Sequence, residues 1–231
     1  MKPTAIFTYL SQESTIDYEG HLSLLMFTAG CNFQCRYCHN PELIPKKKES
    51  VSVKELQNIL FRAKNNWIDA VSISGGEPTM SPYLEETLRI VKSFGFHIKL
   101  DTQGSFPDIL QNALPYLDYV AMDYKMPMEK LSHVTQTKIS KNSILRSIHL
   151  LKESGVDYEI RTTVVPGLQT DSDMIQICKE IAPVQKFVLQ HFVPRENLPD
   201  PSYQKKPRTP LPLLESYQSI CKEYIEQTII R

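Results

Sequence analysis

The sequence has no excess of charge of one sign and no long hydrophobic run. Its 26 basic and 26 acidic residues cancel to a formal net charge of zero, which argues against a general electrostatic partner such as a nucleic acid or an anionic membrane surface. No apolar run approaches the length that a bilayer-spanning helix needs, and residues 1–20 lack the cleavage site of a signal peptide. We therefore expect a cytoplasmic protein with neither a nucleic-acid nor a membrane partner.

Cysteine is scarce outside one short stretch. The chain has five cysteines, an odd number, and three of them are close together at Cys31, Cys35 and Cys38, which argues against a secreted disulfide framework. The other two, Cys178 and Cys221, lie in helix-like contexts and are expected in or near the core. Free thiols also indicate a reducing cytoplasm.

The cluster of cysteines follows an apolar run, Leu22–Phe27, with the spacing C-x3-C-x2-C. Thiolates are the usual ligands of iron–sulfur clusters, and a cubane cluster has four irons to ligate. Three cysteines would leave one iron open, and an open metal position is where a metal site does chemistry. A structural zinc with His39 or a distant fourth ligand stays possible, as do buried thiols without metal. The spacing favours iron–sulfur, because zinc sites usually show two C-x-x-C pairs or a histidine pair.

Short apolar runs alternate with longer amphipathic stretches along the chain. An edge strand is possible over Ala5–Leu10, and further strands are expected at Leu22–Phe27, Ala70–Ser74, His97–Asp101, Tyr119–Met122, Tyr158–Val164 and Phe187–Gln190. Helices are expected at Val53–Asn65, Pro82–Phe94, Pro107–Leu114, Lys141–Ser154, Asp171–Ile181 and Leu211–Ile229. Six strand–helix units imply a parallel α/β sheet with right-handed crossovers, short of the eight units of a closed barrel. A flat doubly wound sheet stays open at this point, and in both folds ligands bind beyond the carboxyl ends of the strands.

A glycine pair ends the second of these parallel strands. Gly75 and Gly76 allow close approach of the backbone to a ligand or a positive φ angle. Glu77 then places a carboxylate beside exposed amides, which suits an ammonium group. The alternative is a tight turn closed by Pro78, and by itself the motif is weak.

Charged and polar side chains lie at or near the ends of later strands. Asp101 and Thr102 offer hard oxygen ligands, although an ordinary turn would also explain them. Asp123 lies two residues from Lys125, and a buried carboxylate is expensive unless it is paired or liganded. Arg161 is a charge inside an apolar strand and needs an anionic partner. A plain Asp–Lys ion pair is the alternative to a ligand site.

Taken together, these motifs resemble the radical S-adenosylmethionine (radical SAM) superfamily, in which an aromatic residue such as Tyr37 precedes the last cysteine. The flanking segments Gly30–Phe33 and Cys38–Leu43 look like the glycyl-radical-enzyme activases. Within these pyruvate formate-lyase activating enzyme-like proteins, the match is closest to the short activating proteins of anaerobic ribonucleoside-triphosphate reductase. Ser14–Gly20 also matches the family, except that Glu19 replaces a proline.

The resemblance covers nearly the whole chain and implies its organisation. We expect a single radical SAM domain over residues 1–231, folded as an open partial (β/α)6 TIM-like barrel. Residues 1–20 would form an N-terminal lead-in, and residues 192–231 a C-terminal loop and helix.

The resemblance also implies two cofactors. A 4Fe–4S cluster would be held by Cys31, Cys35 and Cys38, and S-adenosylmethionine would occupy the open iron. Its expected contacts are Tyr37 for adenine, Gly75, Gly76 and Glu77 for the amino group, Lys125 for the carboxylate, Arg161 for carboxylate or ribose, and Asp101 and His191. The alignment with the family can slip by one or two positions at His191, so Gln190 and Phe192 remain alternatives. A lone histidine is also more often structural than a ligand.

Some activases hold a monovalent cation against the cofactor carboxylate. The resemblance assigns such a cation to Asp101, Thr102 and Asp123, with the Ala121 carbonyl as a possible further ligand. The family commonly carries asparagine where this chain has Gln103, which is a conservative departure.

The implied reaction makes a glycyl radical on a partner enzyme and needs no catalytic acid or base. A reduced flavodoxin or ferredoxin would donate the electron. No cysteine lies between Cys38 and Gly75, so one cluster is all that the chain supports. A small-molecule radical SAM enzyme, such as the 7-carboxy-7-deazaguanine synthases, is the nearest alternative, although His39–Pro41 and Asp101–Gly104 favour the activase. A zinc-stabilised interaction module is a further alternative that leaves Gly75–Pro78 and Asp123–Lys125 unexplained.

Overall fold

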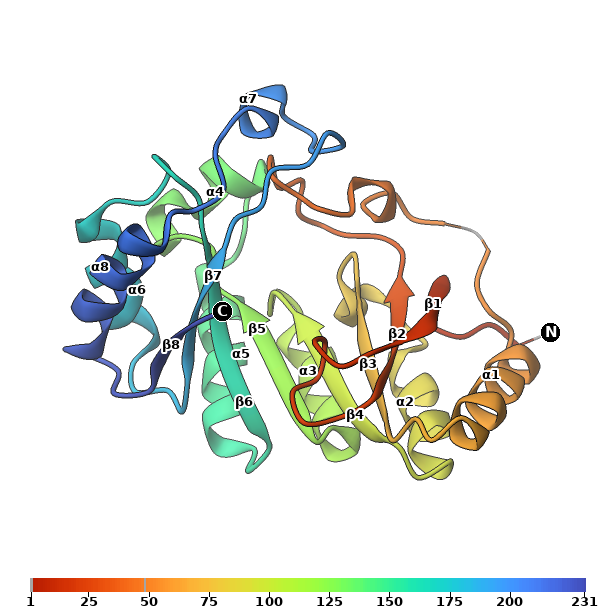
Figure 1. Cartoon of the computed structure of the whole chain (residues 1–231). Coiled ribbons are helices and arrows are strands. Elements are labelled where there is room, and N and C mark those ends of the chain that lie inside the picture. Colours follow the sequence, from red (N-terminus) through yellow and green to blue (C-terminus); the bar gives the residue numbers. More distant parts are fainter. Residues whose placement is uncertain (1, 48) are drawn as a thin grey trace.

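The computed structural model describes residues 2–47 and 49–231, and their strands form one curved eight-stranded sheet in the order β1 to β8 (Figure 1). The β1–β2 pair is antiparallel, and all later neighbours are parallel. The strands are β1 Thr8–Ser14, β2 Ser23–Thr28, β3 Ala70–Gly75, β4 His97–Thr102, β5 Tyr119–Asp123, β6 Asp157–Val164, β7 Phe187–His191 and β8 Thr228–Ile230.

Helices follow the parallel strands and cover the outer side of the sheet (Figure 1). They are α1 Val53–Asn65, α2 Leu84–Ser93, α3 Pro107–Ala113, α4 Met128–Thr135, α5 Lys141–Glu153, α6 Asp171–Ile181, α7 Pro201–Gln204 and α8 Leu211–Lys222, with 3-10 turns at Pro41–Leu43, Pro78–Met80 and Leu114–Tyr116. Among the described helices, none combines the length and apolar character that membrane crossing requires. Since β1 and β8 are the two edges of the sheet, the expected open barrel is confirmed.

The six strands expected after the lead-in are all present, with ends that differ by at most one residue. The edge strand expected over Ala5–Leu10 lies later, at β1. The helix expected to continue to Ile229 ends at Lys222, and β8 follows it, paired in parallel with β7. The β-branched residues of Thr228–Ile230 favour a strand. Helices α4 and α7 were not expected, because neither segment has a long amphipathic repeat.

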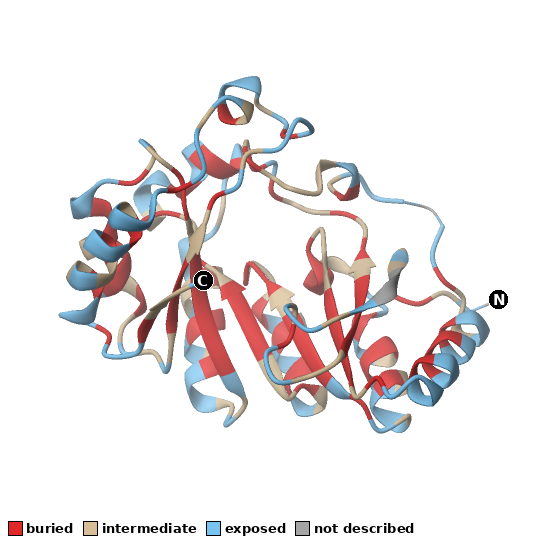
Figure 2. Ribbon diagram, in the orientation of Figure 1, coloured by how far each residue is buried: buried red, intermediate tan, exposed pale blue. Residues whose placement is uncertain are grey.

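Strand residues alternate between an apolar outer face and a polar inner face. In β4, Ile98 and Leu100 belong to the large apolar core under the helices, which Figure 2 shows as a continuous buried layer. Lys99 and Asp101 have the opposite parity and line the cavities inside the barrel. At β4, the interior of the barrel is therefore lined by charged side chains.

Side-chain caps set the starts of several helices, α1 and α6 among them. Ser52 Oγ accepts a hydrogen bond from the Glu55 amide at 3.3 Å, as its position before α1 predicts. Thr170 and Asp173 form a reciprocal capping box at α6. Pro82, expected in the first turn of α2, instead precedes that helix, which begins at Leu84.

Arg231 links β8 to the barrel interior and to the lead-in. Its Nη1 donates to Glu159 Oε1 at 2.8 Å, and its Nη2 donates to Glu19 Oε2 at 3.1 Å. Glu159 is 1% exposed and also accepts a hydrogen bond from the Tyr119 hydroxyl at 2.9 Å. A buried carboxylate depends on such partners, because leaving it uncompensated is costly.

Replacing Arg231 should therefore destabilise the fold. Arg231→Ala removes the cation that pairs with the buried Glu159 carboxylate. The arginine side chain is itself 36% exposed, so solvent screening makes the loss smaller than for a fully buried ion pair. We expect the free energy of unfolding to fall by about 1–3 kcal/mol, measured by urea denaturation. The control Arg89→Ala removes a side chain that is 63% exposed and 4.0 Å from Glu85, and should cost less than about 0.5 kcal/mol. Equal losses in the two variants would contradict this role of Arg231.

Candidate functional site

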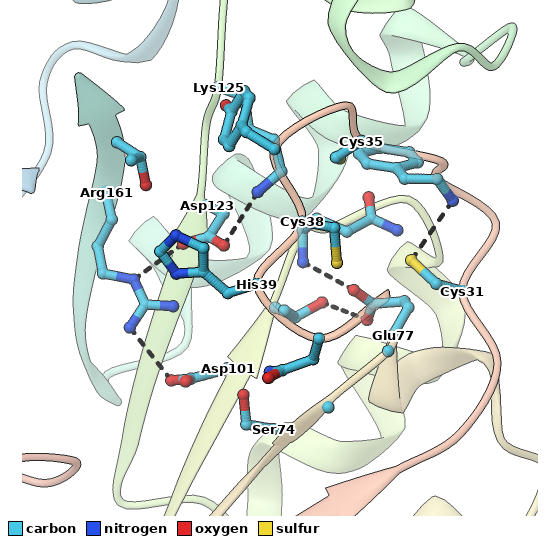
Figure 3. Close-up of a pocket in the computed structure, with 18 of the residues that line it drawn as sticks. Cys31, Cys35, Cys38, His39, Ser74, Glu77, Asp101, Asp123, Lys125 and Arg161 are labelled. Atoms are coloured by element: carbon cyan, nitrogen blue, oxygen red, sulfur yellow. Dashed lines mark hydrogen bonds and ion pairs between the residues drawn. The ribbon is translucent and has the colours of Figure 1, made fainter. Parts of the chain in front are cut away.

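A cavity of about 260 Å³ opens at the carboxyl ends of the parallel strands (Figure 3). Its walls include the three clustered cysteines and every other predicted cofactor-contact residue except His191. The predicted residues that line it are Cys31, Cys35, Tyr37, Cys38, Gly75, Gly76, Glu77, Asp101, Lys125 and Arg161. Parallel strands end at one edge, so motifs far apart in the sequence meet there.

Backbone hydrogen bonds fix the start of the cysteine loop. The Gly30 amide donates to Leu43 O at 2.8 Å, and the Cys31 amide donates to Ile44 O at 2.9 Å. Within the loop, the Phe33 amide donates to Cys31 Sγ at 3.4 Å. The loop is therefore held on both sides of its first cysteine, and one thiol already accepts a hydrogen bond.

The far side of the loop is held by two later segments. The Gln34 amide donates to Thr135 O at the end of α4, at 2.8 Å. Arg36 Nε lies 2.9 Å from Asp200 Oδ2, and the Asp200 amide donates to Arg36 O at 3.1 Å. Residues 192–209 thus pack on the loop between the second and third cysteines, above the open side of the barrel in Figure 1.

Gly75 and Gly76 lie against the base of the cysteine loop. A Cβ on Gly75, whose φ is +123°, would overlap the carbonyl oxygen of Thr28, and one on Gly76 would overlap that of Gly30. The Gly76 amide donates to Thr28 O at 3.0 Å, and the Glu77 amide donates to Gly30 O at 2.8 Å. The close approach that two glycines allow is therefore made to the protein's own backbone as well as to the cavity.

Glu77 is 1% exposed and joins the end of β3 to the end of β4. Its Oε1 accepts from Thr102 Oγ1 at 2.6 Å and from both the amide and the hydroxyl of Thr79, and its Oε2 accepts from the Gln103 amide at 2.8 Å. Burial raises the pKa of Glu77, and these hydrogen bonds oppose that rise. A carboxylate has about four acceptor sites, and these four hydrogen bonds occupy them. Glu77 therefore holds the ends of β3 and β4 together at the cavity wall.

Five charged side chains form a continuous row across β4, β5 and β6. Lys99 Nζ lies 2.7 Å from Asp101 Oδ1, and Arg161 Nη1 lies 3.4 Å from the same oxygen. Arg161 Nε lies 2.9 Å from Asp123 Oδ1, and Lys125 Nζ lies 3.1 Å from Asp123 Oδ2. The row contains three cations and two anions, which leaves one positive charge in excess.

The strand register explains how the row forms. Arg161 of β6 is level with Asp123 of β5, and Asp101 of β4 is level with Ala121 of β5. The short side chain of Ala121 leaves room for Arg161 to reach across β5 to Asp101. Burial alone would raise the pKa of both aspartates, but Arg161 and the neighbouring lysines hold each pKa below its usual range. Both carboxylates are therefore ionised.

The thiols fit a cluster better than a single ion. Burial raises the pKa of Cys31 to about 12, that of Cys35 to about 11 and that of Cys38 above its usual value, while the charge of Lys125 opposes each rise. Binding a metal centre would therefore release protons. Across residues 2–47 and 49–231, no three His, Cys, Asp or Glu side chains converge on one ion position. A cubane cluster presents a separate iron to each of its thiolates.

Tyr37 belongs to a small apolar cluster beside the cavity. It is 6% exposed and packs with Phe192 and Tyr203 at ring-centroid distances of 6.3 and 5.7 Å. Val165 belongs to the same cluster. The Tyr37 hydroxyl is buried and has no hydrogen-bond partner among the described residues. Tyr37 also lines the cavity, so part of this aromatic cluster lies beside the cysteines.

His191 lies away from the cavity, unlike the other predicted contacts. Its Nδ1 is 2.9 Å from Thr209 O, whereas Gln190 lines the cavity. Successive side chains of a strand point to opposite faces. Gln190, one of the two alternatives to His191, is therefore on the face of β7 that lines the cavity.

Two features of the site were missed from the sequence. Lys99 completes the charged row, and its signal was its position two residues before Asp101, on the same face of the strand. The second is the hydrogen bond that the hydroxyl of Thr102, also a candidate cation ligand, donates to Glu77.

Removing the negative charge of Glu77 should loosen the cavity. Glu77→Gln places an amide nitrogen among four hydrogen-bond donors, so we expect a loss of about 1–3 kcal/mol in the free energy of unfolding. Chemical denaturation measures this loss, and the control Glu42→Gln changes an exposed carboxylate of the same loop region. A Glu77→Gln variant as stable as the Glu42→Gln variant would show that the brace has no energetic role.

Comparison with known proteins agrees with this site. Residues 25–181 match the family model described as the radical SAM superfamily. The chain is 34% identical over 228 residues to the "Putative glycyl-radical enzyme activating enzyme MJ1227" of Methanocaldococcus jannaschii, with 94% of this chain and 92% of the relative covered. It is 31% identical over 173 residues to the pyruvate formate-lyase-activating enzyme of Staphylococcus aureus, covering 69% and 68% of the two chains.

The fold is shared with a more distant solved structure. The Streptococcus suis protein SuiB, bound to its precursor peptide SuiA, superposes with a TM-score of 0.69 at 17% identity, covering 91% of this chain and 50% of SuiB. At this identity the likeness concerns the fold alone. The family match removes the support for a zinc-stabilised interaction module. The chain belongs to the radical SAM superfamily and, within it, to the family of the glycyl-radical-enzyme activating enzymes.

Proposed function

We propose that this enzyme cleaves S-adenosylmethionine reductively and generates a glycyl radical on a partner enzyme, with anaerobic ribonucleoside-triphosphate reductase as that partner. The observation that carries the proposal is that three thiols share one cavity with Glu77, Lys125 and Arg161. A 4Fe–4S cluster held by Cys31, Cys35 and Cys38 would supply the electron for reductive cleavage of the sulfonium, the chemistry that hydrogen abstraction from a glycine Cα requires.

The chain's own residues hold and shield the reactants. Cys31, Cys35 and Cys38 would bind three irons and leave the fourth open to ligand amino and carboxylate groups. Lys125 and Arg161 present cations at the cavity wall for the carboxylate and ribose. Each of these roles is a binding or orienting role, because the cofactors carry the chemistry.

The adenine would lie against Tyr37, which lines the cavity and shares an apolar cluster with Val165. Gln190 is the better candidate for the strand-β7 contact, since it lines the cavity and His191 does not. The row of ion pairs fixes the orientation of Lys125 and Arg161 before a ligand binds.

We propose a protein substrate because the barrel is open. The sheet ends at β1 and β8 without completing the eight parallel units of a closed barrel, so a glycine-containing loop of a partner has a route to the cavity. The electron would come from a reduced flavodoxin or ferredoxin in a reducing cytoplasm. Apart from the cofactors and these partners, the proposal requires no nucleic acid and no membrane.

The proposed monovalent cation has to compete with protein cations. Asp101 and Asp123, its expected ligands, already pair with Arg161, Lys99 and Lys125. Binding of a cation would require the cofactor carboxylate to draw one of these side chains away. The binding affinity for S-adenosylmethionine would then depend on whether potassium or a large organic cation is present.

The cluster part of the proposal is tested by electron paramagnetic resonance on anaerobically reconstituted, reduced protein. We expect a 4Fe–4S signal that changes when S-adenosylmethionine is added, because the ligand occupies the open iron. Cys31→Ala should lose the signal and most of the bound iron, whereas the buried core variant Cys178→Ala should keep both. A silent wild-type sample with stoichiometric zinc would contradict the proposal.

The partner part is tested by mixing the reduced enzyme, S-adenosylmethionine and anaerobic ribonucleoside-triphosphate reductase. We expect a glycyl-radical signal on the reductase that is absent when its glycine is replaced by alanine. Cofactor cleavage that is stimulated by a 7-deazaguanine precursor and not by any glycyl radical enzyme would favour the small-molecule alternative.

A further inference from the structure

The row of ion pairs ends beside the cysteines with a positive charge that is not fully balanced. Lys125 Nζ lies 3.1 Å from Asp123 Oδ2, and the other oxygen of that carboxylate accepts from Arg161 Nε at 2.9 Å. Lys125 therefore shares its counter-ion with a second cation. Since the row holds three cations and two anions, one unit of positive charge remains.

The two ends of the row face different cavities. Lys125 lines the cavity that holds the three thiols (Figure 3). Lys99, at the other end, is 6% exposed, has Asp101 at 2.7 Å and lines a second cavity on the opposite side of Arg161. Both lysines share their carboxylates with Arg161, and Lys125 is the one that faces the thiols.

The charge of Lys125 reaches all three sulfurs. Lys125 and the three thiols line one cavity of about 260 Å³. An ammonium group on the wall of so small a cavity favours negative charge at the sulfurs. The Lys125 side chain is 15% exposed, so water screens this field weakly.

We propose that Lys125 sets the reduction potential of the cluster, because its ammonium group favours the extra negative charge that the cluster gains with one electron. The inference rests on the cluster part of the proposed function and is independent of the partner. In a reductive titration, dithionite is oxidised and one electron passes through a mediator dye to the cluster, with no bond formed or broken in the protein.

The size of the effect follows from Coulomb's law. With an effective interior dielectric constant of about 20, a unit charge at a separation of about 10 Å changes an equilibrium constant roughly tenfold. The charge of Lys125 is partly offset by Asp123, but removing the lysine still changes the local charge by one full unit. A tenfold change in a one-electron equilibrium corresponds to about 59 mV.

The test is the midpoint potential of the reconstituted cluster, followed by electron paramagnetic resonance without S-adenosylmethionine. Lys125→Met should lower the ratio of reduced to oxidised cluster about tenfold at a fixed potential, because it removes the charge and keeps an unbranched side chain. Lys125→Arg keeps the charge and should stay near the wild-type ratio. The matched control Lys99→Met removes a charge at the far end of the row and should change the ratio much less.

A second variant predicts the opposite sign. Asp123→Asn removes the carboxylate that offsets Lys125, so the ratio of reduced to oxidised cluster should rise. If Lys125→Met fails to hold a cluster, this variant alone decides the question. The inference would be overturned if the ratio of reduced to oxidised cluster falls in Asp123→Asn. It would also be overturned if the ratio is unchanged in both Lys125→Met and Asp123→Asn. A wild-type protein with no reducible cluster would instead overturn the proposed function, so the two failures are distinguishable.

Discussion

The contact between two backbone segments, Gly75–Glu77 and Thr28–Gly30, is the constraint on which the rest of the site depends. Neither glycine has room for a Cβ, because the carbonyl oxygens of Thr28 and Gly30 occupy that space. Two amide hydrogen bonds join the segments, and the Glu77 carboxylate then ties them to β4. The cysteine loop therefore starts from a fixed point on the sheet, and a metal centre on that loop has a defined place above the strand ends.

A second constraint is the charge inside the barrel. A barrel filled with apolar side chains would give a more stable fold. The attraction within a buried ion pair rarely exceeds the free-energy cost of desolvating its two charges. Here Asp101, Asp123 and Arg161 instead form a row that keeps cations at the cavity wall. Such a row suits a cavity that must take a zwitterionic cofactor and a negatively charged cluster, because its groups are oriented before any ligand arrives.

The sequence predicted the strands and the edge where their motifs meet, because parallel strands place their carboxyl ends together. It was less reliable where a shift of one residue decides which face of a strand a side chain occupies, and where an element is very short. A shift of one position along β7 exchanges Gln190 and His191 between the faces of the strand. The three residues of β8 are too few to show a period, and the partners of Lys99 and Glu77 depend on register between strands, which one sequence does not encode locally.

The proposed function requires that the radical made in this cavity take hydrogen from a glycine of a protein partner. The direct measurement uses a partner reductase whose glycines carry deuterium at Cα, followed by mass spectrometry of the 5′-deoxyadenosine released. Our account predicts one deuterium in the released 5′-deoxyadenosine, lost when the radical-bearing glycine is replaced by alanine. Abundant 5′-deoxyadenosine without deuterium, in the presence of the correct partner, would contradict hydrogen abstraction from glycine.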